Sequence, residues 1–379
     1  MPEPHPPQDE SSNPVTPCSL KALVLAGGKG TRLRPLTYAM AKQLVPVANK
    51  PILHYALDSL YQAEIFDFGI IISPETGESV KQSVQQWQTE KEKPVSLTFI
   101  GQDSPAGLAH AVKIAQPYLQ ASSFLMYLGD NLINADLKAH CKTFIESHAN
   151  ARILLKPVSN PGSFGVAQCN EEGQVLQLDE KPAQPKSNLA LVGVYLFDHS
   201  IFEAVNAIQP SARGELEITD AIQHLINTKK RVDASIHEGW WLDTGKKDDL
   251  LAANHIILGE LTAATVLGRV DAESVISGAV YTDSDSSIEN SRIIGPVSIG
   301  KGVTLQNCEI GPYTSIGNFC QLSGVKLSNS VLLENSCCAG VKTPIVNSII
   351  GKNTRILGAS ENRNHQTVVV ADDSYLELA

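Results

Sequence analysis

A glycine-rich segment near the start of the chain combines residue types that suit phosphate binding. It runs from Leu25 to Thr37, reads LAGGKGTRLRPLT, and begins inside the apolar run KALVLA. Because glycine has no Cβ, the backbone N–H groups of such a loop can approach phosphate oxygens closely. Two better-known loops are excluded. Thr31-Arg32 stands where a P-loop has Lys-Ser or Lys-Thr, and Leu33 stands at the third glycine of the dinucleotide fingerprint.

Two cations close to this loop strengthen the case for phosphate chemistry. Arg32 lies within the loop, and Lys42 follows in the segment AKQLVPV. Together they can neutralise a triphosphate and the negative charge that develops on departing pyrophosphate. The glycines alone would indicate an ordinary turn, so it is their combination with Arg32 and Lys42 that predicts a phosphoryl-transfer site.

Two aspartates enter turns elsewhere in the chain. Asp130 lies in Gly129-Asp130-Asn131 after an expected strand, and Asp243 lies in the segment WLDTG. A single aspartate at a strand end is more often a helix cap. Two separated carboxylates, completed by phosphate oxygens and water, also suit the octahedral coordination of Mg²⁺. Together with the glycine loop, Asp130 and Asp243 are therefore predicted metal ligands of one site.

Alternating strands and helices would place these residues. The periodicity predicts strands over 21–26, 67–73, 95–100 and 122–128, and helices over 51–64, 78–90 and 107–119. This order is typical of a doubly wound, mostly parallel α/β sheet with helices on both faces. Ligands of such sheets lie at the carboxyl ends of the strands. Residues 131 to about 255 continue as mixed α/β, with strands over 151–158, 165–170, 174–180 and 190–198 and helices over 215–230 and 248–261.

After about residue 262 the pattern changes to a six-residue period. Aliphatic residues recur six apart, at Ile293, Ile299 and Leu305, at Ile310, Ile316 and Leu322, and at Ile350 and Ile356. This period is typical of a parallel β-helix of hexapeptide repeats. The buried aliphatic side chain fills a corner of each coil, and glycine relieves crowding at the turn. A glycine-rich β-sandwich is the alternative, because the spacing is irregular over 325–345.

Composition narrows the class of protein. Of the 379 residues 42% are hydrophobic and 18% charged, and the formal net charge is -10. This is an ordinary globular balance and argues against a nucleic-acid-binding surface. The seven cysteines form no C-x-x-C pair, so we expect no zinc site or disulfide framework and a reducing, cytoplasmic location. No stretch reaches the about 18 apolar residues of a membrane span, and the N-terminus has no secretory signal.

Taken in order, the motifs resemble those of the sugar nucleotidyltransferases. The matching segments are L-A-G-G-x-G-x-R-L-x-P-L-T, K-Q-x-x-P-V, G-D-N, E-K-P and W-x-D-T-G. The sequence is especially similar to the glucose-1-phosphate thymidylyltransferases, in the long form that carries a C-terminal left-handed β-helix. The resemblance extends from about residue 21 to the C-terminus. It implies a nucleotidyltransferase catalytic domain over 21–255 and a left-handed β-helix domain over 256–379. The prolines of the first residues favour a disordered tail over 1–20.

The resemblance implies a role for each matching residue. Arg32 and Lys42 would be catalytic, and Asp130 and Asp243 would hold Mg²⁺. The nucleotide would be bound by Leu25, Gly27, Gly28, Gly30, Thr31, Gln102 and Gly107, with the Gln102 amide pairing with the imide edge of a pyrimidine. The sugar phosphate would be bound by Gly165, Glu180, Lys181, Leu191, Val192, Gly193, Arg213 and Trp241. Phe164 departs from the family pattern, in which a tyrosine often precedes the glycine, so one hydroxyl contact is lost.

The implied reaction joins dTTP to glucose 1-phosphate and releases pyrophosphate, with Mg²⁺ as cofactor. The product, dTDP-glucose, would enter nucleotide-sugar and polysaccharide biosynthesis, and the β-helix would support a homo-oligomer. Alternatives are UTP as the nucleotide, another sugar 1-phosphate, or a non-catalytic regulatory subunit. Hexapeptide β-helices also occur in acetyltransferases, which generally use a histidine base on the coil. No histidine stands between His255 and His365, which argues against acyl transfer.

Overall fold

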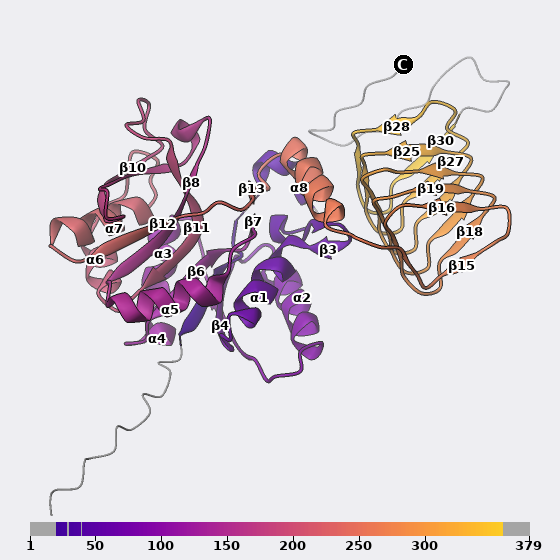
Figure 1. Cartoon of the computed structure of the whole chain (residues 1–379). Helices are drawn as coiled ribbons and strands as arrows, with labels where there is room; N and C mark the ends of the chain where they lie inside the picture. Colours follow the sequence, from indigo (N-terminus) through magenta and orange to yellow (C-terminus); the bar gives the residue numbers. More distant parts are fainter. Residues whose placement is uncertain (1–19, 29, 39, 359–379) are drawn as a thin grey trace, which may run out of the picture.

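One helix joins two folded parts in the computed structural model of the chain, which describes residues 20–28, 30–38 and 40–358 (Figure 1). The first part is a sheet with helices on both faces, and the second is a stack of short strands. Residues 1–19 of the predicted tail and 359–379 of the predicted β-helix domain lie outside the described residues. Within the described ranges, every helix is too short or too polar to cross a membrane.

The central sheet has nine strands and is parallel on one side and largely antiparallel on the other. The parallel strands lie side by side in the order β5 (Ser96–Gly101), β4 (Asp67–Ile72), β1 (Lys21–Leu25) and β6 (Phe124–Leu128). Strand β11 (Leu189–Phe197) pairs antiparallel with β6. Beyond it lie β8 (Ala151–Pro157), β9 (Gly165–Cys169), β10 (Val175–Glu180) and β12 (Val232–Ile236).

Helices cover both faces because the buried strands are apolar on both sides. Along β1, Ala22 and Val24 pack with one core and Leu23 and Leu25 with the other. The first core includes α1 (Ile52–Gln62), α2 (Gly77–Thr89) and α5 (Leu137–Ser147). The second includes α3 (Leu108–Ile114), α4 (Gln116–Leu119), α6 (Ile201–Ala207) and α7 (Ile218–Asn227). The predicted doubly wound α/β fold is confirmed.

The C-terminal part consists of three parallel sheets that the chain visits in turn. The first contains β14 (Thr265–Val266), β17 (Val280–Thr282), β20 (Val297–Ile299), β23 (Thr314–Ile316), β26 (Val331–Leu332) and β29 (Ile349–Ile350). The second contains β15 (Arg269–Val270), β18 (Ser287–Glu289), β21 (Thr304–Gln306), β24 (Gln321–Ser323), β27 (Cys337–Ala339) and β30 (Arg355–Leu357). The third contains β16 (Val275–Ser277), β19 (Arg292–Ile294), β22 (Glu309–Ile310), β25 (Lys326–Ser328) and β28 (Ile345–Val346). These stacked sheets fit the predicted left-handed β-helix, and their parallel pairing excludes the sandwich.

The hexapeptide pattern follows from this stacking. Ile293, Ile299 and Leu305 lie on three consecutive strands and are all 0% exposed. Leu305 pairs with Leu322, which lies 17 residues later in the sequence. Leu322 pairs with Cys338, which lies only 16 residues later. The next pairing along the third sheet, Leu327 with Ile345, is instead one residue longer than that of Ile310 with Leu327. These unequal coils explain the irregular period over 325–345. The shorter coil also explains Cys338, which takes the place of a stacked aliphatic residue in the core of the β-helix.

Several short elements were not predicted, among them the hairpin of β2 (Pro46–Val47) and β3 (Lys50–Pro51) and the pair of β7 (Asn131–Ile133) with β13 (Trp241–Asp243). Helices α5 and α6 and strand β12 were also missed. The short 3-10 helices are η1 (Thr31–Leu33), η2 (Leu36–Tyr38), η3 (Lys42–Leu44) and η4 (Pro161–Ser163). The predicted helix over 248–261 is α8 (Lys247–Gly259). The expected domain boundary at 255 falls inside α8. The predicted domain ranges remain a prediction.

Candidate active site

The glycine loop leaves the carboxyl end of β1 and folds back against Lys42. Gly30 has a left-handed backbone, with φ 61°, and a Cβ at this position would lie 2.7 Å from the Lys42 Cβ. The Thr37 hydroxyl donates a 2.7 Å hydrogen bond to the Gly30 carbonyl. Glycine is therefore required at position 30 both by the backbone angle and by the close approach of Lys42.

Lys42 lies between the two predicted metal ligands. Its Nζ is 2.7 Å from Asp130 Oδ2 and 3.7 Å from Asp243 Oδ1, and the residue is only 5% exposed. The Arg32 guanidinium lies beside Gly245, two residues after Asp243, since a Cβ built on Gly245 would be 3.2 Å from Arg32 Nη2. Residues 32, 42, 130 and 243, which come from three separate regions of the sequence, thus form one cluster of two cations and two carboxylates.

The pairing of β7 with β13 brings the two carboxylates together. Asp243 stands opposite Asn131 in this antiparallel ladder, and Thr244 Oγ1 donates a 2.7 Å hydrogen bond to the Asp130 carbonyl. Burial raises the pKa of Asp243, and the negative charge of Asp130 adds to this increase. The positive charges of Lys42 and Arg32 act in the opposite direction. Neither aspartate caps a helix, because Asp130 leads directly into β7 and the N-cap of α8 is Lys246. The helix-cap alternative is therefore wrong for both.

The predicted base-recognition segment lies beside the loop. A Cβ at Gly27 would be 3.6 Å from the Gln102 side-chain oxygen, and Gln102 Nε2 donates a 3.3 Å hydrogen bond to the Gly107 carbonyl. The same Nε2 is 3.1 Å from His110 Nδ1. This places the Gln102 amide at the edge of the glycine loop, where a base could be read.

Gly107 is needed for backbone packing. It has φ 101°, and a Cβ there would lie 2.3 Å from the Leu216 carbonyl oxygen. On either side of it, the Ala109 N–H donates to the Leu216 carbonyl and the Leu216 N–H donates to the Ala106 carbonyl. This contact also explains why the predicted helix over 215–230 begins only at Ile218.

Gly107→Ala is expected to reduce the free energy of unfolding by about 1–3 kcal/mol, because the new Cβ meets backbone in a strained conformation. Urea unfolding followed by circular dichroism measures it. Gly101→Ala is the matched control, since a Cβ at Gly101 has no atom within 4 Å. Equal stability of the two variants would contradict the packing role of Gly107.

The predicted sugar-phosphate residues form a second cluster around Glu180. Its Oε1 is 3.1 Å from Arg213 Nη2, and its Oε2 accepts a 3.2 Å hydrogen bond from the Thr219 hydroxyl. Burial, and then the charge of Glu217, raises the pKa of Glu180. Gly165 stands opposite Glu180 in the β9–β10 ladder. A side chain at Gly165 would collide with Thr219.

The cations of this cluster differ in their environment. Arg213 Nη2 lies 2.8 Å from Glu217 Oε2 and also contacts Glu180 and Glu215, so three carboxylates neutralise it. The Lys181 ammonium makes a single ion pair within the described ranges, at 3.7 Å from Glu180. Lys181 is therefore the less engaged of the two cations proposed for the sugar phosphate.

Trp241 links the two clusters. Its ring packs edge-on against Phe164 at 5.1 Å between centroids, and its Nε1 donates a 3.3 Å hydrogen bond to Asn131 Oδ1. A Cβ at Gly193 would lie 2.4 Å from Asn131 Nδ2, at an irregularity in β11 where φ is 83°. The preceding Leu191 and Val192 are buried and pack into the two cores of the sheet.

Two residues of the site were not selected from the sequence. Asn131 is 4% exposed and lies between Trp241 and Gly193. Gln43 is 2% exposed, its Nε2 lies 3.3 Å from a Cβ built on Gly28, and its Oε1 has no hydrogen-bond partner among the described residues. A buried acceptor beside this glycine loop is a candidate ligand contact. The sequence signal was position alone, because each residue directly follows a predicted site residue.

The donor set fits a hard divalent cation. Among the described residues no group of three or more histidine, cysteine, aspartate or glutamate side chains forms a metal site. Asp130 and Asp243 are a pair of carboxylates that share Lys42, and both side chains are partly exposed. Mg²⁺ takes one or two carboxylates and completes its shell with water and phosphate oxygens, so two ligands suffice.

Comparison with known proteins gives the class to which this fold and site belong. Residues 21–260 match the model of the nucleotidyl transferase family. The chain therefore belongs to the nucleotidyl transferase family. It is 44% identical to the glucose-1-phosphate thymidylyltransferase of Streptomyces antibioticus, covering 95% of this chain and 99% of that protein. The enzyme of the same name from Streptomyces griseus is 41% identical, with 95% and 100% covered.

A solved structure supports the same assignment over 65% of the chain. It is described as a putative glucose-1-phosphate thymidylyltransferase from Bacillus anthracis in complex with sucrose. It is 32% identical, with a TM-score of 0.58, and covers 65% of this chain and 98% of that one. The family resemblance predicted from the ordered motifs is thus confirmed, and the two Streptomyces enzymes match over nearly their full length.

Proposed function

We propose that this protein transfers a nucleotidyl group from dTTP to α-D-glucose 1-phosphate, giving dTDP-glucose and pyrophosphate. The observation that carries the proposal is the single cluster of Arg32, Lys42, Asp130 and Asp243 at the end of the glycine loop. The names of the full-length Streptomyces relatives support the choice of nucleotide and sugar.

The proposed step is an in-line displacement at the α-phosphorus of the triphosphate. A phosphate oxygen of glucose 1-phosphate forms the new bond, and the bond to the β-phosphate bridging oxygen breaks to release pyrophosphate. The attacking oxygen is already anionic at neutral pH, so no general base is needed. Catalysis then consists of holding the two substrates in line and neutralising charge. Arg32 and Lys42 would supply that neutralisation.

The remaining predicted contacts divide between the two substrates. Leu25, Gly27, Gly28, Gly30 and Thr31 would hold the triphosphate, while Gln102 would read the pyrimidine. Glu180 would accept hydrogen bonds from sugar hydroxyls, and Lys181 and Arg213 would pair with the sugar phosphate. Trp241 would lie between the sites, supported by its contact with Phe164.

Asp130 and Asp243 are the proposed Mg²⁺ ligands. Bound there, the ion would neutralise phosphate charge and act as a Lewis acid on the reacting phosphoryl group. Lys42 would hold the two carboxylates close together, since it pairs with both.

An assay of pyrophosphate release tests the proposed reaction. We expect release with dTTP plus glucose 1-phosphate, none when the sugar phosphate is omitted, and dTDP-glucose as the product on chromatography. Burying one thymine methyl is worth about 1 kcal/mol, so UTP should be used about fivefold less efficiently. A preference for UTP would contradict the nucleotide assignment. Absence of pyrophosphate with either nucleotide would contradict the reaction and favour a regulatory subunit.

Two further aspects belong to this proposal. Self-association through the β-helix is supported by exposed apolar side chains on its first coils, at Val266, Leu267 and Val275. A cytoplasmic location is supported by the cysteines of the described ranges, which are all free, because disulfides are rare in reducing compartments.

A further inference from the structure

Helix α8 lies between the sheet domain and the β-helix, as its orange ribbon in Figure 1 shows. Asn254, in the middle of this helix, is 0% exposed. Its Oδ1 accepts hydrogen bonds from the Ala48 N–H at 3.0 Å and from the Ser315 hydroxyl at 2.8 Å. Its Nδ2 donates to the Tyr313 carbonyl at 3.1 Å. One buried amide thus binds the β2–β3 hairpin and the β-helix together.

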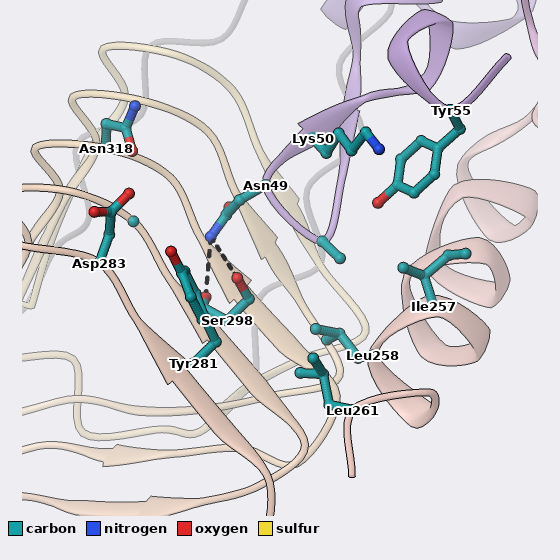
Figure 2. A pocket seen from close by; sticks show the side chains of 12 residues that line it. Asn49, Lys50, Tyr55, Ile257, Leu258, Leu261, Tyr281, Asp283, Ser298 and Asn318 are labelled. Carbon is teal, nitrogen blue, oxygen red and sulfur yellow. Dashed lines mark hydrogen bonds between the residues drawn. The ribbon is translucent and has the colours of Figure 1, made fainter. Parts of the chain in front are cut away.

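A second asparagine makes the same connection from the hairpin. Asn49 Nδ2 donates to the Ser298 carbonyl and hydroxyl at 3.2 and 3.0 Å (Figure 2). It also donates to the Ile316 carbonyl at 2.9 Å. Asn49 and Ala48 form the hairpin turn, with φ 66° and 48°. Asparagine tolerates this left-handed conformation, so the turn and the contact are both satisfied by residue 49.

Helix α8 also packs on the β-helix through apolar side chains, since Leu251 contacts Val331 and Leu333, and a cavity borders the polar contacts. This cavity of about 510 Å³ lies between the β-helix and the hairpin with the C-terminal end of α8. Figure 2 shows it between Tyr55, Leu258 and Leu261 on one side and Tyr281, Asp283 and Asn318 on the other. At the edge of this cavity, the bonds from Asn49 to Ser298 connect the hairpin to the β-helix.

The hairpin continues directly from Lys42. The Val45 N–H donates to the Lys42 carbonyl at 3.2 Å, and the Ile52 N–H donates to the Val45 carbonyl at 3.2 Å. The Tyr55 hydroxyl donates to the Val47 carbonyl at 2.8 Å. A displacement of the hairpin would therefore move the backbone from which the Lys42 side chain reaches Asp130.

We propose that Asn49 and Asn254 are positioning residues through which the β-helix holds Lys42 in place for the reaction. The role of Lys42 in this statement rests on the proposed function. The β-helix is then part of the catalytic apparatus, in addition to any part it has in self-association.

The test compares Asn49→Gly with a control. Glycine keeps the left-handed turn and removes only the amide, so the variant is expected to fold. Lys247→Ala is the control, because Lys247 Nζ also contacts the β-helix, at the Asn347 carbonyl, but lies outside the hairpin. Asn254→Ala is a second, more disruptive variant, since it leaves the Ala48 N–H and the Ser315 hydroxyl unpaired. Melting temperature shows whether each variant is folded.

Amide hydrogen exchange is the first readout and does not depend on activity. Peptides that cover residues 41–50 should exchange faster in Asn49→Gly and Asn254→Ala than in Lys247→Ala or the unchanged protein. Unchanged exchange would overturn the proposal. An unchanged protein that releases no pyrophosphate would contradict the proposed function alone, because the exchange result still decides whether the asparagines hold the hairpin.

A double-mutant cycle with Lys42→Ala is the second readout. Asn49→Gly should lower kcat/KM for the triphosphate by about 10–100-fold, as expected for a small misplacement of a catalytic group. In the Lys42→Ala background the same change should have little further effect, because both act through one side chain. Independent, multiplicative losses in the double variant would show that the asparagines do not act through Lys42.

Discussion

Lys42→Ala is expected to lower kcat for nucleotidyl transfer by about 10²–10³-fold, by analogy with the loss of one transition-state donor. Lys42 is 5% exposed and is the residue of the site that contacts both carboxylates, at 2.7 and 3.7 Å. Its removal deletes a cation beside the phosphate loop and leaves Asp130 and Asp243 facing each other. Steady-state pyrophosphate release with saturating substrates measures the effect.

The matched control is Lys301→Ala, a surface lysine of the β-helix whose ion pair with Asp285 is 3.7 Å long. Exposed pairs of this kind contribute little, so turnover should be unchanged. A melting temperature for Lys42→Ala separates lost catalysis from lost folding. Near-normal turnover in a folded Lys42→Ala variant would remove Lys42 from the catalytic residues.

Much of the fold could be predicted from local patterns. The strand that ends at Leu25 is apolar on both faces, so its burial in a parallel sheet followed from its sequence. The topology then placed the glycine loop at a carboxyl edge. The six-residue period likewise predicted the coils of the β-helix. In each case neighbouring residues carry the whole signal, because the period of the element sets which side chains are buried.

The details of the site depend on contacts that no local pattern contains. Asp130 and Asp243 meet because two three-residue strands, β7 and β13, pair although they lie far apart in the sequence. Strands this short have too few residues to show a period. The pairing of Arg213 with Glu180, and the contacts of Asn254 with two separate parts of the chain, depend in the same way on tertiary packing.

Asp130→Asn and Asp243→Asn are each expected to raise the Mg²⁺ concentration needed for half-maximal activity by at least about tenfold, the scale seen when support for a metal site is lost. Asparagine keeps the size of the side chain and removes its charge, so the change tests ligation with little change in packing. Activity measured across a Mg²⁺ titration at fixed triphosphate gives the result. Mn²⁺ binding followed by electron paramagnetic resonance gives a readout that does not depend on turnover.

Asp285→Asn on the surface of the β-helix is the control, and its Mg²⁺ titration should match that of the unchanged protein. The comparison between the two site variants carries more information than either alone. If the pair forms one metal site, both titrations shift together, because either loss leaves a single carboxylate against Lys42. A shift confined to one variant would mean that the other aspartate serves Lys42 only, and unchanged titrations in both would remove the metal from the pair.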